Sequence, residues 1–88
     1  MPVSATDLDT ALRVPLQAVS LDVRDDSHLH AGHAGALEGR HFSVRVVSER
    51  FSGLSRVARH RLVYDAAADL MVRGIHALAI DARTPGES

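Results

Sequence analysis

Hydrophobic and polar residues alternate in two stretches of the chain, and this pattern predicts two strands. Residues 19–24 alternate strictly, and residues 41–48 place Phe42, Val44 and Val46 on one face. A period of two is typical of a strand with one face on the core and the other in solvent. We therefore expect two half-buried strands before residue 50.

Two other stretches repeat their hydrophobic residues at helical spacing. A short helix is predicted to begin at Thr6, whose hydroxyl is suited to cap it, and Pro15 ends or bends it. A longer helix is predicted from Ser55 to Gly74, a glycine suited to end a helix. Residues 54–61 are compatible either with a separate turn or with the beginning of this helix.

A third strand is predicted at residues 75–82, which are apolar on both faces and therefore central or covered. Residues 25–40, between the first two strands, contain three glycines and are typical of a long loop. The order is α–β–β–α–β. We expect one α/β (α+β) domain over residues 1–88, with flexible ends at 1–5 and 84–88.

The composition excludes several classes of site. The chain has 88 residues, 45% of them hydrophobic and 24% charged, and no cysteine. A disulfide framework, a thiolate metal site and a cysteine nucleophile are therefore excluded. No apolar run approaches the roughly 20 residues of a membrane span, and the start does not resemble a secretory signal. We expect a cytoplasmic protein that does not contact a membrane.

The net charge of −1 hides an uneven distribution. Residues 40–61 carry six arginines and one glutamate, whereas the segments on either side are acidic. Such a basic segment is either a solvated helix face or a surface for an anionic partner, nucleic acid or acidic protein. The candidate binding residues in it are Arg50, Arg56, Arg59, His60 and Arg61. The scarcity of aromatic residues argues against stacking on single-stranded nucleic acid.

Six histidines are many for this length, and three of them, His28, His30 and His33, fall in the predicted loop. Imidazole suits zinc, copper, nickel or iron, but a metal site usually needs three or four protein ligands. His76 is the candidate for a further ligand, because the start of the last strand is expected to approach the loop. The alternatives are a histidine-rich loop without a metal, a core histidine at position 76, and a homo-oligomeric metal-binding module of the three loop histidines.

No motif indicates catalysis. The sequence contains no Gly-x-Ser-x-Gly, no P-loop and no His-Glu-x-x-His, and its serines have no evident histidine and aspartate partners. We therefore expect that the chain is not an enzyme.

Several short motifs occur together in the order and spacing of a known family. They are Asp26-Ser27-x-x-His30, His41-Phe42, Val47-Ser48-x-x-Phe51-x-Gly53, Arg59-His60-Arg61-Leu62-Val63-Tyr64, Ile75-His76-Ala77-Leu78 and Thr84-Pro85. Each motif alone is weak, but the set is specific and covers residues 22–86. The chain resembles the BolA family.

This resemblance implies a fold similar to the type II K-homology (KH-like) fold, with a three-stranded mixed sheet and helices on one side. It also implies a partner, a monothiol glutaredoxin, with which members share a [2Fe–2S] cluster in cluster trafficking or iron sensing. The glutaredoxin and a glutathione supply sulfur, and the BolA partner supplies imidazole nitrogen. The matching residues are His76 and, in the loop, His30, with His33 as its competitor. No cluster is expected in the isolated chain, for which a weak homodimer is a further alternative.

The family has a second attributed role, as a DNA-binding transcriptional regulator in the stress response. Residues 50–61 would carry it here. A K-homology domain clamps nucleic acid with a Gly-x-x-Gly loop, and the only such spacing, residues 32–35, falls in the histidine loop. The arginines can instead receive the glutaredoxin. If Arg59 and His76 share one surface, cluster and DNA binding are mutually exclusive.

Overall fold

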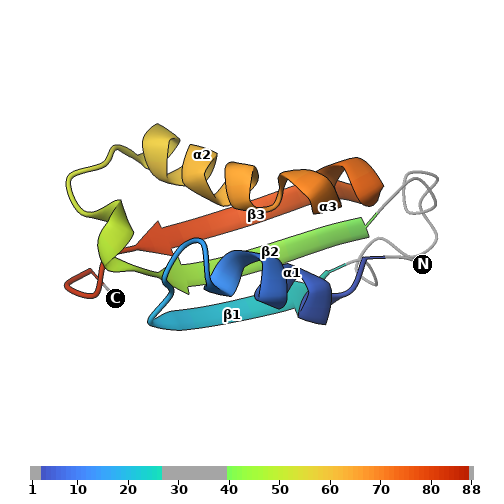
Figure 1. Ribbon diagram of the computed structural model, residues 1–88, viewed down its shortest axis with the longest axis horizontal. Coiled ribbons are helices and arrows are strands. Elements are labelled where there is room, and N and C mark those ends of the chain that lie inside the picture. Colours follow the sequence, from blue (N-terminus) through green and yellow to red (C-terminus); the bar gives the residue numbers. More distant parts are fainter. Residues whose placement is uncertain (1–2, 27–39, 88) are drawn as a thin grey trace.

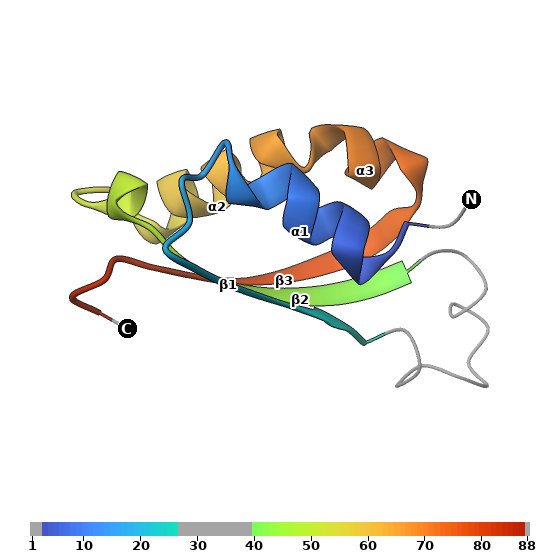
Figure 2. The same cartoon turned by 60° about the horizontal axis from the view of Figure 1, so that its bottom comes forward.

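The computed structural model shows a three-stranded sheet with α1, α2 and α3 on one side of it (Figure 1, Figure 2). It describes residues 3–26 and 40–87. The elements are α1 (Ala5–Arg13), β1 (Ser20–Asp25), β2 (Arg40–Val47), the short 3₁₀ helix η3 (Glu49–Phe51), α2 (Arg56–Ala66), α3 (Ala68–Arg73) and β3 (Ile75–Arg83). β1 and β2 are antiparallel, whereas β2 and β3 are parallel. The predicted mixed sheet with helices on one side is confirmed.

The core lies between the sheet and the helices. Phe42, Val44 and Val46 of the central strand β2 face the helices and are at most 3% exposed, which confirms the predicted alternation. The fully buried apolar side chains that meet them from the other elements include Leu8, Leu12, Leu16, Phe51 and Val63. Each buried side chain of this size contributes about 1.5–3 kcal/mol through the hydrophobic effect.

α1 is capped by Ser4 and not, as predicted, by Thr6. The Ser4 hydroxyl accepts a hydrogen bond from the Asp7 backbone N–H at 3.1 Å, and the Asp7 carboxylate accepts one from the Ser4 N–H at 3.0 Å. This reciprocal pair is a capping box, and its bonds to the carboxylate hold the pKa of Asp7 below its ordinary value. Ser4 has the extended backbone of a cap, which leaves Thr6 inside the first turn.

The predicted helix from Ser55 to Gly74 is divided into α2 and α3. Ser55 caps its beginning, with its hydroxyl 3.1 Å from the Ala58 N–H. The division falls at Ala67, which is fully buried and leaves the helical backbone conformation, with φ −96° and ψ 6°. No glycine or proline marks this position, so the sequence carried no signal for the break.

The separate turn precedes the range in which it was predicted. It is η3, immediately after β2 and not within residues 54–61. The hydroxyl of the buried Ser48 initiates it by accepting a hydrogen bond from the Arg50 N–H at 3.0 Å. The same hydroxyl donates to the Leu16 carbonyl at 2.5 Å, which ties η3 to the chain after α1. Gly53, with φ 75°, then turns the chain toward α2.

β3 is an edge strand, although its apolar composition predicted a central or covered one. The strand order is β1-β2-β3, so β3 is paired with β2 alone among the described strands. Leu78 and Ile80 belong to the core, whereas Ala79 is exposed on the face without helices. Alanine is small enough to occupy that open face at little cost, so the residue type did not reveal the orientation.

Both ends, which we expected to be flexible, make defined contacts in their described parts. Val3 is 3% exposed and belongs to the core. At the other end, Glu87 forms an ion pair with Arg59.

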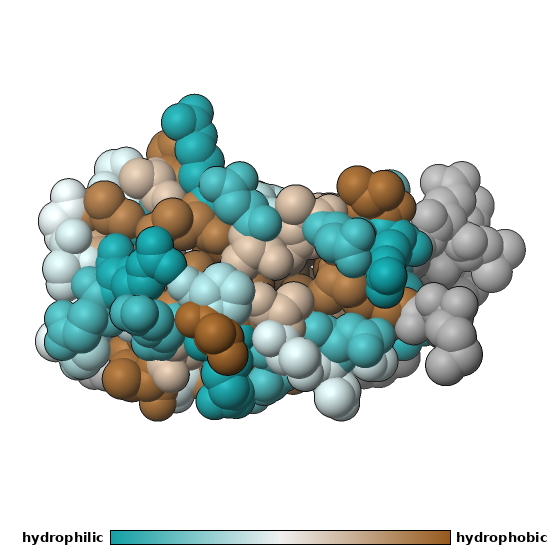
Figure 3. All heavy atoms as spheres, viewed as in Figure 1, coloured by the Kyte–Doolittle hydropathy of each residue, from teal (hydrophilic) through white to brown (hydrophobic). Residues whose placement is uncertain are grey.

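The large hydrophobic residues on the surface come from different elements. They are Val14, Val19, Val57, Tyr64 and Val72. Figure 3 shows hydrophobic and hydrophilic residues interspersed on the face that contains α1. Single exposed hydrophobic side chains are normal on protein surfaces. Within residues 3–26 and 40–87, no helix has the length and apolar character needed to cross a bilayer.

The glycine between α3 and β3 gives a first prediction. Gly74 has φ 150°, a conformation that other residues adopt only under strain, and its carbonyl accepts a hydrogen bond from the Arg40 N–H at 3.0 Å. Gly74→Ala is expected to lower the free energy of unfolding by about 1–3 kcal/mol, measured by urea denaturation. Gly86→Ala is the matched control, because Gly86 has open space around it and no positive φ. Equal costs at the two glycines would contradict the strain at Gly74.

Candidate metal centre

Two histidines meet at one end of the sheet. β2 and β3 are parallel, so their first residues lie together at that end (Figure 1). The ring centroids of His41 and His76 are 5.2 Å apart, with 51° between the ring planes. The two histidines come from different strands and are 35 positions apart in the sequence. The parallel pairing of β2 with β3 brings them together.

An irregularity in the pairing positions His76. Arg40 pairs with Ile75 and His41 pairs with Ala77, so His76 is an extra residue on β3. A bulge of this kind re-aims a side chain. Ile75 is buried and His76 is exposed, so the chain anchors its strand in the core immediately before it presents the imidazole to solvent. His76 is therefore a surface histidine, and the alternative of a core histidine is wrong.

The spacing of the two rings suits a shared metal ion. With metal–nitrogen bonds of about 2.0–2.1 Å and tetrahedral angles, two imidazoles on one ion have ring centroids about 5 Å apart. The observed 5.2 Å is compatible with that separation, and it is also an ordinary distance for two rings in tilted contact. No set of three or more histidine, aspartate or glutamate ligands occurs within the parts of the chain that the structure describes. Two imidazoles alone do not complete a metal site, so a metal ion bound here would need further ligands from elsewhere.

The loop predicted to supply a ligand is attached at this same end. Its histidines, His28, His30 and His33, lie outside the described residues. The residue before the undescribed segment, Asp26, donates its N–H to the His41 carbonyl at 2.8 Å. The residue after the segment, Arg40, pairs with Asp25 and donates its N–H to the Gly74 carbonyl. Both attachment points of the loop therefore lie beside the histidine pair.

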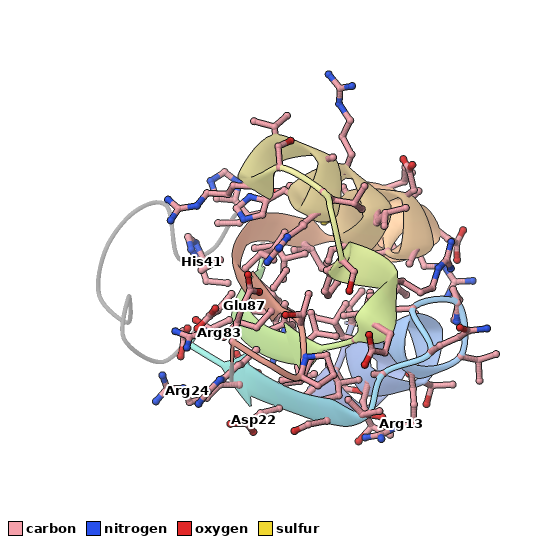
Figure 4. The ribbon with its side chains drawn as sticks, turned by 90° about the vertical axis from the view of Figure 1, so that its left-hand side faces the viewer. Arg13, Asp22, Arg24, His41, Arg83 and Glu87 are labelled. Carbon is pink, nitrogen blue, oxygen red and sulfur yellow. The ribbon has the colours of Figure 1, made fainter. Side chains whose placement is uncertain are left out.

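Polar side chains interact with one another on the sheet face that carries His41. His41 lies on the side of the sheet without helices, where Figure 4 labels it. On the same face, the Ser43 hydroxyl donates to the Asp26 carboxylate, and the Arg24 guanidinium lies 3.7 Å from that carboxylate. These contacts fix the strand ends next to the imidazoles.

His41 is the residue that sequence reasoning missed as a ligand candidate. It was recognised only as part of a His-Phe motif. The available signal was its place at the beginning of the second strand, since a parallel neighbour would bring the beginning of the last strand beside it. The sequence pattern did not show whether those two strands are parallel or antiparallel. The contact between His41 and His76 was therefore not predicted.

Only some of the arginine-rich candidates line one common cleft. Arg56, Arg59 and His60 line one cleft, whereas Arg50 and Arg61 are exposed and are not part of its lining. Arg50 donates to the Pro15 carbonyl.

The proximity of Arg59 to His76 that we expected is wrong. Arg59 donates to the Ala82 carbonyl at 3.1 Å, near the far end of β3. Because a strand rises about 3.3 Å per residue, the step from His76 to Ala82 corresponds to about 20 Å. The histidine pair and the arginine cleft therefore lie toward opposite ends of the sheet, and mutual exclusion through a shared surface has no structural basis.

Known proteins share both the sequence and the fold of this chain. SufE-like protein 1, chloroplastic/mitochondrial, from Arabidopsis thaliana is 47% identical over 83 residues, which cover 86% of this chain and 22% of that protein. Protein BOLA1, chloroplastic, from the same plant is 43% identical over 89 residues, which cover 96% of this chain and 55% of that protein. The chain thus spans about a fifth of the first relative and about half of the second.

The solved structure of the BolA domain of SufE1 from Arabidopsis thaliana has a TM-score of 0.83 and 43% identity, and the match covers 98% of this chain and 96% of that one. The sequence model of the family described as BolA-like protein matches residues 12–87. The predicted resemblance is confirmed, and the chain belongs to the BolA-like protein family.

Proposed function

We propose that this chain holds a [2Fe–2S] cluster jointly with a monothiol glutaredoxin and glutathione, in cluster trafficking or iron sensing. The observation that carries the proposal is the pair His41 and His76, 5.2 Å apart at the end of the sheet where the loop is attached. A surface that offers imidazoles but no complete ligand set suits a cluster whose other ligands belong to a partner.

His76 is the first ligand in this proposal. Its exposed imidazole lies directly after buried Ile75, so the backbone holds it at the rim where a second protein can dock. The second imidazole is His41, the neighbour of His76, or a histidine of the predicted loop, where His30 is favoured over His33. Two imidazoles in place of two thiolates on one iron raise the reduction potential, as in Rieske centres. A ligating imidazole must be deprotonated, so acidification is expected to release the cluster.

The test is anaerobic cluster reconstitution of the chain mixed with a monothiol glutaredoxin and glutathione, followed by visible absorption and circular dichroism. His76→Ala is expected to weaken cluster retention by more than about 100-fold, since loss of an outer-shell partner alone costs 10–100-fold. Alanine at His30, His33 or His41 identifies the second ligand by the same loss. His76 is exposed, so stability should change by no more than about 0.5 kcal/mol.

His60→Ala is the matched control, because His60 lines the cleft at the other end of the sheet. It should leave the spectrum of the mixture unchanged. A spectrum that is identical for the wild-type chain and His76→Ala, or that equals the spectrum of the glutaredoxin alone, would remove the proposal.

DNA binding by the arginine segment remains a prediction, and the structure gives it less support than the cluster role. Arg50 and Arg59 both have partners within the chain, so their guanidiniums are not freely available to phosphates. The absence of enzymatic activity also remains a prediction. So does a cytoplasmic location, because the two Arabidopsis relatives are named as chloroplastic or mitochondrial proteins.

A further inference from the structure

The cleft at the far end of the sheet contains a preorganised arginine. The cleft has a volume of about 690 Å³ and lies between the beginning of α2 and the end of β3. The Arg59 Nε donates to the Leu54 carbonyl at 3.0 Å, and its Nη1 donates to the Ala82 carbonyl at 3.1 Å. Its side chain is only 15% exposed. Two carbonyls from different parts of the chain therefore fix the guanidinium before any ligand binds.

The remaining donors of this guanidinium hold a carboxylate. Arg59 Nη1 and Nη2 lie 2.6 and 3.2 Å from the two carboxylate oxygens of Glu87, and the Thr84 N–H lies 2.8 Å from one of them. A two-point contact of this kind recognises the planar shape of a carboxylate. Arg59 and the Thr84 N–H lower the pKa of Glu87 from 4.5 to about 2.

Glu87 is held in a way that permits its exchange. It lies in the short turn over residues 84–87, in which the Glu87 N–H donates a hydrogen bond to the Thr84 carbonyl at 3.0 Å. Its side chain is 47% exposed, so solvent reaches the carboxylate while Arg59 stays fixed beneath it. Figure 4 shows Glu87 beside Arg83, whose guanidinium lies 3.3 Å from the Glu87 carbonyl. Only this turn must move to expose the arginine.

We infer that the cleft is a carboxylate-binding site for a glutamate-containing acidic peptide, and that Glu87 occupies it as an intramolecular stand-in. This inference concerns the opposite end of the sheet from His76 and does not depend on the cluster proposal. In the present arrangement three arginines, Arg56, Arg59 and Arg83, face two carboxylates, Asp81 and Glu87. When the turn moves away, Asp81 is the carboxylate that remains in the cleft lining, and the net positive charge of the lining increases by one.

The walls of the cleft favour a peptide over nucleic acid. Leu54, Ile80 and Ala82 supply apolar surface beside Arg59, which suits the aliphatic part of a glutamate side chain and its neighbours. Asp81 keeps a negative charge in the cleft, paired with Arg83 at 2.8 Å. A nucleic-acid backbone brings several phosphates close together, and a fixed carboxylate among them is unfavourable.

The test measures binding of an acetylated and amidated peptide, Thr-Pro-Gly-Glu-Glu, to the whole 88-residue chain by calorimetry. Glu87→Gln removes the charge of the internal competitor and leaves only a neutral amide oxygen to accept from Arg59, so the peptide is expected to bind this variant at least about tenfold more tightly than the wild type. The NMR signal of the Arg59 Nε–H should shift on binding. A second substitution, Arg59→Gln, should abolish the gained affinity, and the NMR signal gives a direct readout if that double variant folds poorly.

The controls separate this site from general charge attraction. Asp69→Asn removes an exposed carboxylate that pairs with Arg73 at 3.2 Å, and it should leave the affinity at the wild-type value. A peptide with glutamine in place of glutamate should not bind. Equal peptide affinity for the wild type and Glu87→Gln would overturn the inference. The inference would also be overturned if Glu87→Gln raised the affinity for inorganic phosphate or for a short DNA duplex but not the affinity for the peptide.

Discussion

Replacing Phe51 by alanine is expected to lower the free energy of unfolding by about 3–5 kcal/mol. Phe51 ends η3 and is fully buried in the core. Its carbonyl also accepts a hydrogen bond from the Leu54 N–H at 3.1 Å, so the ring anchors the segment that leads to the arginine cleft. The free energy of unfolding of a native domain is about 0.05–0.15 kcal/mol per residue, so the loss is a large fraction of the total for a domain of this size. The variant should be partly unfolded at room temperature.

Urea denaturation followed by far-ultraviolet circular dichroism measures this loss. Val57→Ala is the matched control, because Val57 is 64% exposed, and its stability should stay within about 0.5 kcal/mol of the wild type. A cost at Phe51 as small as the cost at Val57 would mean that η3 does not belong to the folded core.

The local elements were predictable because their signals are local. The alternation of Phe42, Val44 and Val46 predicted both the second strand and the side that it buries. Ser55 and Gly74 marked the two ends of the helical segment, since a residue with a capping hydroxyl and a glycine are visible in the sequence itself. The division at Ala67 lacks such a residue and was missed.

The candidate site was only half predictable, because its geometry is set by pairing between distant segments. His76 was identified from its place at the start of the last strand, and the family motif pointed to the same residue. Its neighbour His41 was not identified, because their contact requires both the parallel pairing of β2 and β3 and the bulge that sets their register. A shift of one residue in that register would turn His76 to the other face of the sheet.

Arg59 shows a different limit of sequence reasoning. A cluster of arginines in a basic segment indicates a surface for anions, and the charge count was correct. The count does not reveal that Arg59 is bonded to Glu87, 28 positions further along the chain. Electrostatics in a folded chain depends on which charges are brought together, and the sequence gives only their number and local spacing.

The first helix provides a further prediction, because most of it precedes the region that matches the family. The family match begins at residue 12, whereas α1 spans Ala5–Arg13. Leu8 nevertheless is fully buried. Leu8→Ala is therefore expected to lower the free energy of unfolding by about 2–5 kcal/mol, the range for truncating a buried leucine. α1 would then be a structural part of this domain and not an appendage.

Val14→Ala is the control on the same segment, since Val14 directly follows α1 and is 79% exposed. Its cost should stay within about 0.5 kcal/mol, measured in the same urea titration. If Leu8→Ala were equally mild, the sheet with α2 and α3 would be a stable core without α1. The His41–His76 pair, which lies on the strands, should then keep its geometry when α1 is removed. If Leu8→Ala is costly, loss of α1 should weaken the sheet that aligns the two imidazoles.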